Sequence, residues 1–197
     1  VMAAQDKIVK YLDMPIQHAS GSILSAMNRP GDRETLTNTI KKIRETVPGI
    51  ILRTTLMTGF PGEGQAEFDE LCDFIKEMKF ERLGCFAFSP EEGTAAYSMS
   101  NQVDDREKQR RRDIVMQEQS RISDEFNRSV IGKTLEVLVE SYDRYAGCWF
   151  GRSAADAPDI DGKVFFSCPS DEVKPGDMVK VNITDSMDWD LMGECCD

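Results

Sequence analysis

The segment spanning residues 50–78 constrains the fold more than any other part of the chain. Residues 50–57 are apolar and rich in β-branched side chains, and they are long enough for one strand. This strand runs into a turn that contains Gly59 and Gly62, and residues 66–78 then follow a helical pattern. A strand, a glycine-rich turn and a helix in this order predict a βα unit.

The turn between this strand and this helix has two interpretations. Glycine lets a ligand come close to the backbone, and the start of the following helix offers unpaired N–H groups, so the turn suits a nucleotide-like molecule. The alternative is a tight connection without a ligand, because short Gly/Pro turns are common in α/β proteins. From spacing alone both interpretations stay open. Glu63, which follows the turn, is expected to cap the helix.

The neighbouring segments continue the alternation of strands and helices. Residues 11–18 predict a strand whose C-terminal end carries Gln17 and His18, and residues 32–47 predict a helix with apolar side chains at intervals of three and four. Residues 80–88 predict a third strand. Both crossovers are long enough for right-handed βαβ units, so the sequence predicts an α/β fold with a parallel sheet covered by helices.

Three strands are too few for a complete domain of this kind. Parallel strands need neighbours at both edges and cover on both faces. Residues 1–10 are predicted to be the tail of a helix and supply no further strand. We therefore expect the sequence to begin in the middle of a domain.

Two polar features allow both a structural and a functional interpretation. His18 is the only histidine, and it is expected either to hold the loop after its strand through a hydrogen bond or to take part in chemistry. Residues 110–112 are three arginines on a helix predicted from 104 to 130. They suit phosphate binding, but a solvated helix face paired with nearby carboxylates is the favoured interpretation.

Beyond Gly132 the hydrophobic period changes to two, which is typical of strands with one buried face. Five short strands predict a small closed barrel of the OB-like kind, and barrels of that shape are recognition modules. The expected domains are a βα portion over residues 1–103, a connecting helix over 104–132 and a β barrel over 133–197. The five expected strands cover residues 135–139, 147–151, 163–167, 177–184 and 188–194.

Charge is distributed unevenly along the chain, whose formal net charge is −11. The total of 24 Lys and Arg divides into 19 before Thr134 and 5 from there on, and the 35 Asp and Glu divide into 21 and 14. An acidic module has no general surface for neutralising phosphates, so nucleic acid is disfavoured as its main partner. A basic protein fits this charge better.

The cysteines and the hydropathy pattern indicate the cellular compartment. The six cysteines fit no metal-ligand spacing and are interpreted as free thiols in a reducing compartment. No run of 18 apolar residues and no signal-peptide pattern is present, so neither a membrane span nor a membrane partner is expected. A cytoplasmic location is predicted.

Four motifs occur in a fixed order over nearly the whole chain, in residues 12–20, 53–63, 86–94 and 151–162. They read LDMPIQHAS, RTTLMTGFPGE, FAFSPEEGT and GRSAADAPDIDG. Together they closely resemble the radical S-adenosylmethionine methylthiotransferases, and among these the RimO type, which modifies an aspartate of ribosomal protein twelve of the small subunit. The resemblance implies the C-terminal part of a partial TIM-type (βα) barrel followed by a TRAM domain, with a basic ribosomal protein as partner.

The resemblance also implies a cofactor site and two cofactors. S-adenosylmethionine is expected to bind on the inner side of the barrel, and the full-length enzymes carry two 4Fe-4S clusters. No catalytic side chain and no metal ligand is assigned within this chain. The residues expected to line the cofactor side are Gln17, Arg53, Thr55, Gly59, Phe86, Phe88 and Ser89, and a packed barrel interior is the structural alternative for them.

One departure from the family pattern concerns the cluster ligands. The family binds its cluster through three cysteines spaced C-x3-C-x2-C, and the six cysteines of this chain contain no such triplet. The chain is therefore interpreted as the C-terminal part of a longer enzyme that is inactive alone, because reduction of the sulfonium needs an electron from an iron centre. The alternatives are a tRNA-adenosine methylthiotransferase and a non-catalytic module that binds ribosomal protein or RNA.

Overall fold

The computed structural model describes residues 1–169 and 173–196, and the chain divides into two compact units. The first unit comprises Val1–Gln5 and Leu12–Ile122, and the second comprises Asp6–Tyr11 and Ser123–Asp197. The domain boundaries expected after residues 103 and 132 stay a prediction.

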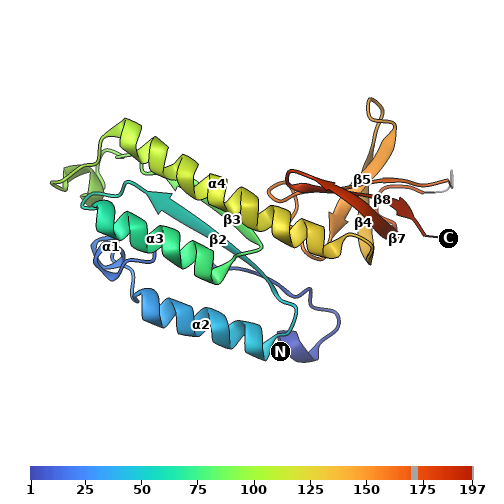
Figure 1. The fold of residues 1–197 in the computed structure, drawn as a ribbon, viewed down its shortest axis with the longest axis horizontal. Coiled ribbons are helices and arrows are strands. Elements are labelled where there is room, and N and C mark those ends of the chain that lie inside the picture. Colours follow the sequence, from blue (N-terminus) through green and yellow to red (C-terminus); the bar gives the residue numbers. More distant parts are fainter. Residues whose placement is uncertain (170–172, 197) are drawn as a thin grey trace. The chain divides into compact units, whose positions relative to one another are not determined.

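A parallel sheet forms the centre of the first unit. Its strands are β1 (Tyr11–Asp13), β2 (Ile51–Thr58) and β3 (Arg82–Ala87), in the order β1-β2-β3 (Figure 1). β2 and β3 run parallel from the pair Arg53↔Arg82 to the pair Thr58↔Ala87. The predicted α/β architecture with a parallel sheet is therefore confirmed.

The first predicted strand is shorter than expected. Strand β1 ends at Asp13, whereas the prediction extended to residue 18. Pro15 lacks the N–H that a ladder needs, which interrupts the pairing. Beyond it only Gln17 returns to the sheet, through an isolated parallel bridge to Leu56, and its φ of +70° turns the chain away afterwards.

Helices cover one face of this sheet, and most of them coincide with the expected segments. Residues 1–10 are not the tail of a helix, because only a short 3-10 turn forms there and the polar run Gln-Asp-Lys at residues 5–7 offers no apolar face to bury. Over residues 1–169 and 173–196 the helical elements are α1 (Gly21–Ala26), α2 (Arg33–Thr46), α3 (Gln65–Met78), α4 (Asp105–Val130), η1 (Met2–Ala4) and η2 (Ala95–Ser98).

Local capping contacts explain where two of these helices begin. The Asp32 side chain accepts a hydrogen bond of 2.8 Å from the backbone N–H of Thr35 at the start of α2. At the start of α3 the side chain of Glu67 accepts a bond of 3.0 Å from the backbone N–H of Gly64. Helix α3 is therefore capped by Glu67, and Glu63 is left for a different role.

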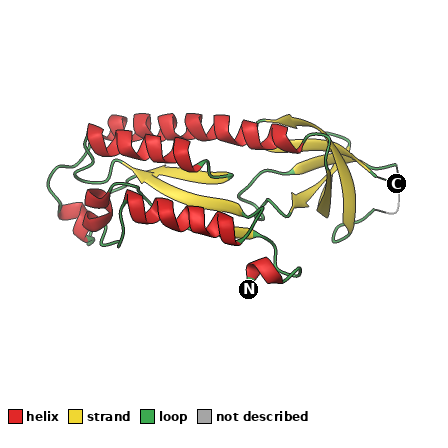
Figure 2. Cartoon of the chain, turned by 60° about the horizontal axis from the view of Figure 1, so that its bottom comes forward, coloured by secondary structure: helices red, strands yellow, loops and turns green. Residues whose placement is uncertain are grey.

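Alternation along β2 separates a packed face of the sheet from an open one. Leu52, Leu56 and their alternate neighbours are buried, and they pack in a core with residues of the helices, among them Phe74. The opposite face, which carries Thr55, is only half-buried. Figure 2 shows the strands of this unit as yellow arrows lying against red helices.

The second unit is a closed barrel of five strands in the order β4-β5-β6-β8-β7, which confirms the predicted OB-like barrel. The inward side chains of these strands form a separate apolar core that includes Val137, Phe166 and Ile183. The strands are β4 (Thr134–Asp143), β5 (Cys148–Ser153), β6 (Val164–Ser167), β7 (Met178–Met187) and β8 (Asp190–Cys195).

Two glycines let the barrel strands approach each other closely. A Cβ on Gly151 would lie 2.1 Å from the carbonyl oxygen of Leu138 on the neighbouring strand. A Cβ on Gly193 would lie 2.4 Å from the carbonyl oxygen of Asn182. Glycine is therefore needed at both places to close the barrel.

Hydropathy along the helices bears on membrane insertion. Among the residues that the structure describes, no helix combines the length and the apolar character needed to cross a bilayer.

Candidate functional site

The open face of the sheet carries the side chains of three predicted site residues, Arg53, Thr55 and Phe86, and a fourth, Gln17, reaches the same strand through its backbone. The backbone N–H of Gln17 donates to the carbonyl oxygen of Thr55 at 2.9 Å, which places Gln17 beside the middle of β2. Arg53 and Thr55 are two residues apart and lie on the same half-buried face of that strand. Phe86 is the register partner of Met57, two positions further along the same face, and is 61% exposed. This face has the form of one wall of a site.

Polar contacts orient the side chains of this wall. The guanidinium of Arg53 donates to the Asp13 carboxylate at 2.7 Å, and its Nη1 lies 3.5 Å from the hydroxyl of Thr55. Thr55 is the register partner of Gly84, which carries no side chain to cover it. The wall therefore presents a hydroxyl group and an aromatic ring on neighbouring strands.

The remaining predicted site residues lie beyond the carboxyl ends of the strands. Phe88 is buried in a small apolar cluster with Phe60 and Ile23, and the two phenylalanine ring centres are 5.1 Å apart. Ser89 is exposed, and its hydroxyl lies 3.3 Å from the carboxylate of Glu91. The assignment of Phe88 and Ser89 to a cofactor site stays a prediction, as it does for the four residues of the wall.

The glycine-rich turn after β2 is closely packed against α4. Gly59 has a φ of +75°, and a Cβ built on it would lie 2.2 Å from Cγ of the buried Lys108. The hydroxyl of Thr58 donates to the Lys108 carbonyl oxygen at 3.2 Å. Close approach of a helix accounts for glycine at this position, while the proposed role of Gly59 in cofactor binding stays a prediction.

Glu63 is the centre of a buried polar cluster that links three segments of the first unit. Its carboxylate accepts a bond of 2.9 Å from the backbone N–H of Gly59 and a bond of 2.8 Å from Arg111. Arg111 also donates to the Glu63 carbonyl oxygen at 2.8 Å. Nε2 of His18 lies 3.3 Å from the same carboxylate. We call His18, Gly59, Glu63 and Arg111 the Glu63 cluster. The expectation that Glu63 caps a helix is wrong.

His18 holds the loop that follows its strand. It is fully buried, and its Nδ1 accepts a hydrogen bond of 2.9 Å from the backbone N–H of Ser20. An Nδ1 that accepts leaves Nε2 as the protonated nitrogen of the neutral ring, and Nε2 is the atom that faces Glu63. These contacts favour the structural interpretation of this histidine.

The three arginines at 110–112 differ from one another, and the expected solvated face is only partly correct. Arg110 is exposed and pairs with Glu107, but Arg111 is 6% exposed and reaches into the Glu63 cluster. Burial opposes its charge, yet hydrogen bonds to Glu63 and Glu107 outweigh burial and raise the pKa of Arg111. Hydrogen bonds from Arg110 and Arg111 lower the pKa of Glu107 to about 2.

Sequence reasoning missed Arg111 because it considered the arginines as one block. The buried positions of α4 include Lys108, Arg111, Val115, Gln119 and Ile122, at intervals of three and four residues. Extending the apolar stripe upstream from Val115 by the same spacing reaches Arg111. This spacing is the signal that could have located it.

The cysteines are free thiols, and they belong to both units. Burial raises the pKa of Cys85 in β3 to about 12 and that of Cys72 in α3 to about 11, so neither is a ready thiolate ligand. Among the described residues no group of three His, Cys, Asp or Glu side chains could hold a metal ion. The donor set of the described residues therefore does not fit an iron–sulfur cluster.

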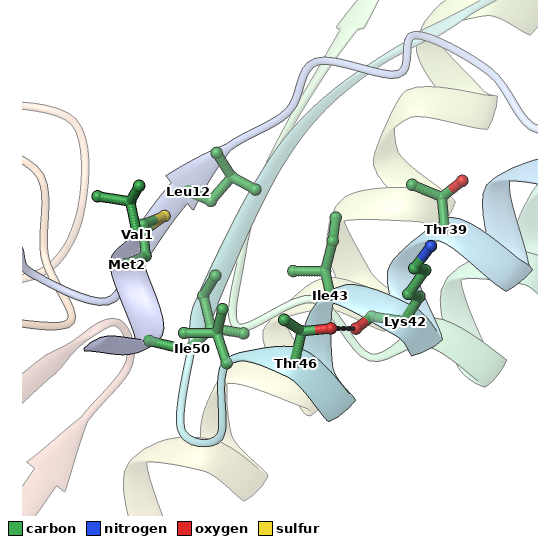
Figure 3. Close-up of a pocket in the computed structure, with 10 residues that line it drawn as sticks. Val1, Met2, Leu12, Thr39, Lys42, Ile43, Thr46 and Ile50 are labelled. Atoms are coloured by element: carbon green, nitrogen blue, oxygen red, sulfur yellow. Dashed lines mark hydrogen bonds between the residues drawn. The ribbon is translucent and has the colours of Figure 1, made fainter. Parts of the chain in front are cut away.

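An apolar pocket of about 550 Å³ lies at the other end of β2, where the strand begins (Figure 3). Val1, Leu12, Ile43 and Ile50 line it, together with other residues of η1 and α2. It contains none of the predicted site residues. In parallel βα folds the carboxyl ends of the strands carry function, so we assign this pocket no role in the site.

Comparison with known proteins assigns the second unit to a domain family. Residues 131–196 match the TRAM domain family, so a TRAM domain is present in the C-terminal part of the chain. This agrees with the closed five-stranded barrel described above.

Relatives over nearly the whole chain carry a more specific name. The chain is 47% identical over 95% of its length to the ribosomal protein uS12 methylthiotransferase RimO of Caldanaerobacter subterraneus subsp. tengcongensis. It is 44% identical over 98% of its length to the RimO of Bdellovibrio bacteriovorus, and 46% over 98% to that of Pelotomaculum thermopropionicum. The chain is thus homologous to uS12 methylthiotransferases, which confirms the resemblance seen in the motifs. It matches their C-terminal part and spans 42%, 42% and 44% of their lengths, respectively.

Proposed function

We propose that this chain is the C-terminal part of an enzyme that methylthiolates an aspartate of ribosomal protein uS12 by radical S-adenosylmethionine chemistry. The observation that carries the proposal is the 44–47% identity to uS12 methylthiotransferases over 95–98% of the chain. The parallel βα unit followed by a TRAM barrel supports it independently. The free cysteines are compatible with the reducing cytoplasm that the proposal requires.

The open face of the sheet is the proposed S-adenosylmethionine wall. The exposed ring of Phe86 suits stacking with an adenine base, and the side chains of Gln17 and Thr55 suit hydrogen bonds to a ribose or an amino acid. When bound, S-adenosylmethionine supplies the radical chemistry of the reaction. Arg53 orients the wall through Asp13. Gly59, Phe88 and Ser89 complete the proposed site at the strand ends.

The part of the chain that the structure describes offers no fitting ligands for the iron–sulfur clusters of the proposed enzyme. The described residues contain no group of three potential metal ligands, and burial raises the pKa of four of the thiols, those of Cys72, Cys85, Cys148 and Cys195. The cluster ligands of the proposed enzyme therefore lie outside this sequence.

The TRAM barrel is the proposed docking module for the basic substrate protein. From Thr134 onward the sequence has 5 Lys and Arg against 14 Asp and Glu, a net formal charge of 5 − 14 = −9. Opposite charge steers a basic protein towards such a surface, whereas the phosphates of RNA are repelled. The same charge balance disfavours the alternative substrate, an adenosine of tRNA.

Substrate choice is tested by titrating the 197-residue chain with uS12 and, separately, with tRNA at about 0.15 M salt, where exposed charges are screened beyond roughly 8 Å. We expect uS12 to bind more tightly, and its affinity to fall as salt increases. An equally basic protein unrelated to ribosomes serves as the control for charge alone. Tighter binding of tRNA than of uS12 would show that the protein-modifying assignment is wrong.

A further inference from the structure

An apolar row crosses the outer surface of the TRAM barrel on three adjacent strands. Phe150 of β5 is the register partner of Phe165 of β6, and Phe165 is the register partner of Met192 of β8. Register partners lie side by side on the same face of a sheet. The alternate residues Gly151 and Phe166 are buried inside the barrel, so this row faces outward. We call Phe150, Phe165 and Met192 the apolar ridge.

The ridge is a continuous surface and is separate from the barrel core. The two phenylalanine ring centres are 5.9 Å apart, and the ammonium group of Lys163 lies 4.4 Å from the centre of the Phe150 ring. Met192 is 41% exposed, and both phenylalanines are half-buried. The seven buried residues of the core cluster come from the inward positions and do not include the ridge. An outward apolar row of this kind marks an interaction surface.

Carboxylates border the Met192 end of the ridge. Asp185 is the register partner of Met192 on β7, and it is exposed. Glu194 follows Met192 on the same face of β8 and is exposed as well. Asp190 precedes Met192 on the same face of β8, and its side chain accepts a hydrogen bond of 2.7 Å from the backbone N–H of Lys163. The border is therefore mainly acidic, like the unit as a whole.

We propose that the apolar ridge and its acidic border dock a basic protein segment, with an aromatic or aliphatic side chain on Phe165 and Met192 and lysine or arginine side chains beside Asp185 and Glu194. OB-like barrels bind their ligands through the face of the second and third strands, which are β5 and β6 here. The identity of the partner as uS12 rests on the proposed function; the chemistry of the surface does not.

Single-stranded RNA is the competing occupant, and the charges disfavour it. Nucleic-acid bases stack on exposed aromatic rings, so Phe150 and Phe165 alone would suit RNA. RNA binding also needs cations along the phosphate backbone, whereas the Met192 end of the ridge is bordered by Asp185, Asp190 and Glu194. A basic peptide satisfies both the apolar row and its border.

Fluorescence titrations of the 197-residue chain test the surface with defined probes. The probes are a short peptide in which lysine alternates with phenylalanine, the same peptide with serine for phenylalanine, and a single-stranded oligouridine. The double variant Phe165→Thr/Met192→Thr removes the apolar contact with residues that suit strands. Asp185→Lys/Glu194→Lys reverses the border charge at two exposed positions. Met178→Thr, at a position that is 60% exposed on β7 and outside the ridge, is the matched control.

We expect the lysine–phenylalanine peptide to bind the parent chain, and each double variant to weaken binding at least about tenfold, with Met178→Thr unchanged. The serine peptide should bind weakly to every variant. Tryptophan fluorescence checks that the barrel of each variant is folded. If the Phe165→Thr/Met192→Thr variant unfolds, the peptide affinity of the charge-reversed variant tests the proposal. Unchanged peptide affinity in the double variants, or preferential binding of oligouridine by the parent chain, would overturn the proposal.

A parallel titration with uS12 separates this proposal from the proposed function. If the parent chain binds the peptide through the ridge but does not bind uS12, the docking surface stands and the assigned substrate is wrong. If uS12 binds equally well to the parent chain and to the Phe165→Thr/Met192→Thr variant, the substrate stands and the ridge is not its docking surface.

Discussion

Replacing Glu63 by alanine is expected to destabilise the first unit by about 3–5 kcal/mol, because it removes the buried one of the two carboxylates that pair with the buried Arg111 guanidinium and leaves only the partly exposed Glu107. Arg111 is 6% exposed, and Glu63 also accepts the backbone N–H of Gly59. Both lost bonds are inside the protein, where water does not replace them. The expected loss is a large part of the stability of a typical domain, which is about 5–15 kcal/mol.

Urea unfolding measures this effect because two signals separate the units. Both tryptophans, Trp149 and Trp189, belong to the second unit, so their fluorescence follows the barrel. Circular dichroism of the helices follows α1, α2, α3 and the part of α4 up to Ile122, which all belong to the first unit. We expect Glu63→Ala to lower the urea concentration at the midpoint of the helical transition. The midpoint of the tryptophan transition should stay unchanged.

Two further variants identify the cause of the Glu63 effect. Glu67→Ala removes a half-exposed carboxylate that caps α3, and it should cost only about 0.5–2 kcal/mol. The double variant Glu63→Leu/Arg111→Met removes the buried pair as a whole and should cost less than the sum of its single changes. Two results would contradict the described cluster. One is a loss of unfolding free energy in the double variant that equals the sum of the losses in its two single variants. The other is an equal loss in Glu63→Ala and Glu67→Ala.

Gly59→Ala is the second change with a large expected effect, about 2–5 kcal/mol. A side chain at a φ of +75° costs about 1–2 kcal/mol, and overpacking costs about 1–3 kcal/mol. Here the added Cβ would lie 2.2 Å from Cγ and 2.8 Å from Cβ of Lys108. Those atoms belong to the base of a buried side chain, so relief requires a movement of α4.

Gly62→Ala in the same turn is the matched control. Its φ is +91°, but no atom lies within 4 Å of the added Cβ, so only the backbone cost of about 1–2 kcal/mol applies. The midpoint urea concentration of the helical transition should therefore fall further for Gly59→Ala than for Gly62→Ala. Equal midpoints for the two variants would show that α4 does not pack on the turn as described.

Local sequence signals predicted the elements, whereas pairing between distant segments determined the site. The apolar run at 50–57 and the helical spacing that follows correspond closely to β2 and α3. The period of two after Gly132 predicted five strands, but the parallel pairing of β6 with β8 depends on the closure of the barrel and has no local signal. The apolar ridge follows from that pairing.

The same limit applies to the first unit. Gln17 meets β2 only because the chain returns to the sheet after Pro15, and Phe86 lies beside Met57 through the register of two strands. Neither contact is encoded by spacing along the chain. The Glu63 cluster joins segments 45 and 48 residues apart, since 63 − 18 = 45 and 111 − 63 = 48. Sequence periodicity does not extend across such separations.

The most direct test of the account is an activity measurement on a chimera. The C-terminal part of the RimO of Caldanaerobacter subterraneus subsp. tengcongensis that matches this chain is replaced by the 197-residue sequence, and the protein is reconstituted with iron and sulfide. After incubation with S-adenosylmethionine, a reductant and a sulfur source, mass spectrometry examines uS12 and tRNA separately. We expect a methylthio group on one aspartate of uS12 and unmodified tRNA. A folded chimera with intact clusters that modifies tRNA adenosine, or that leaves uS12 unmodified while the parent RimO modifies it, would contradict the account.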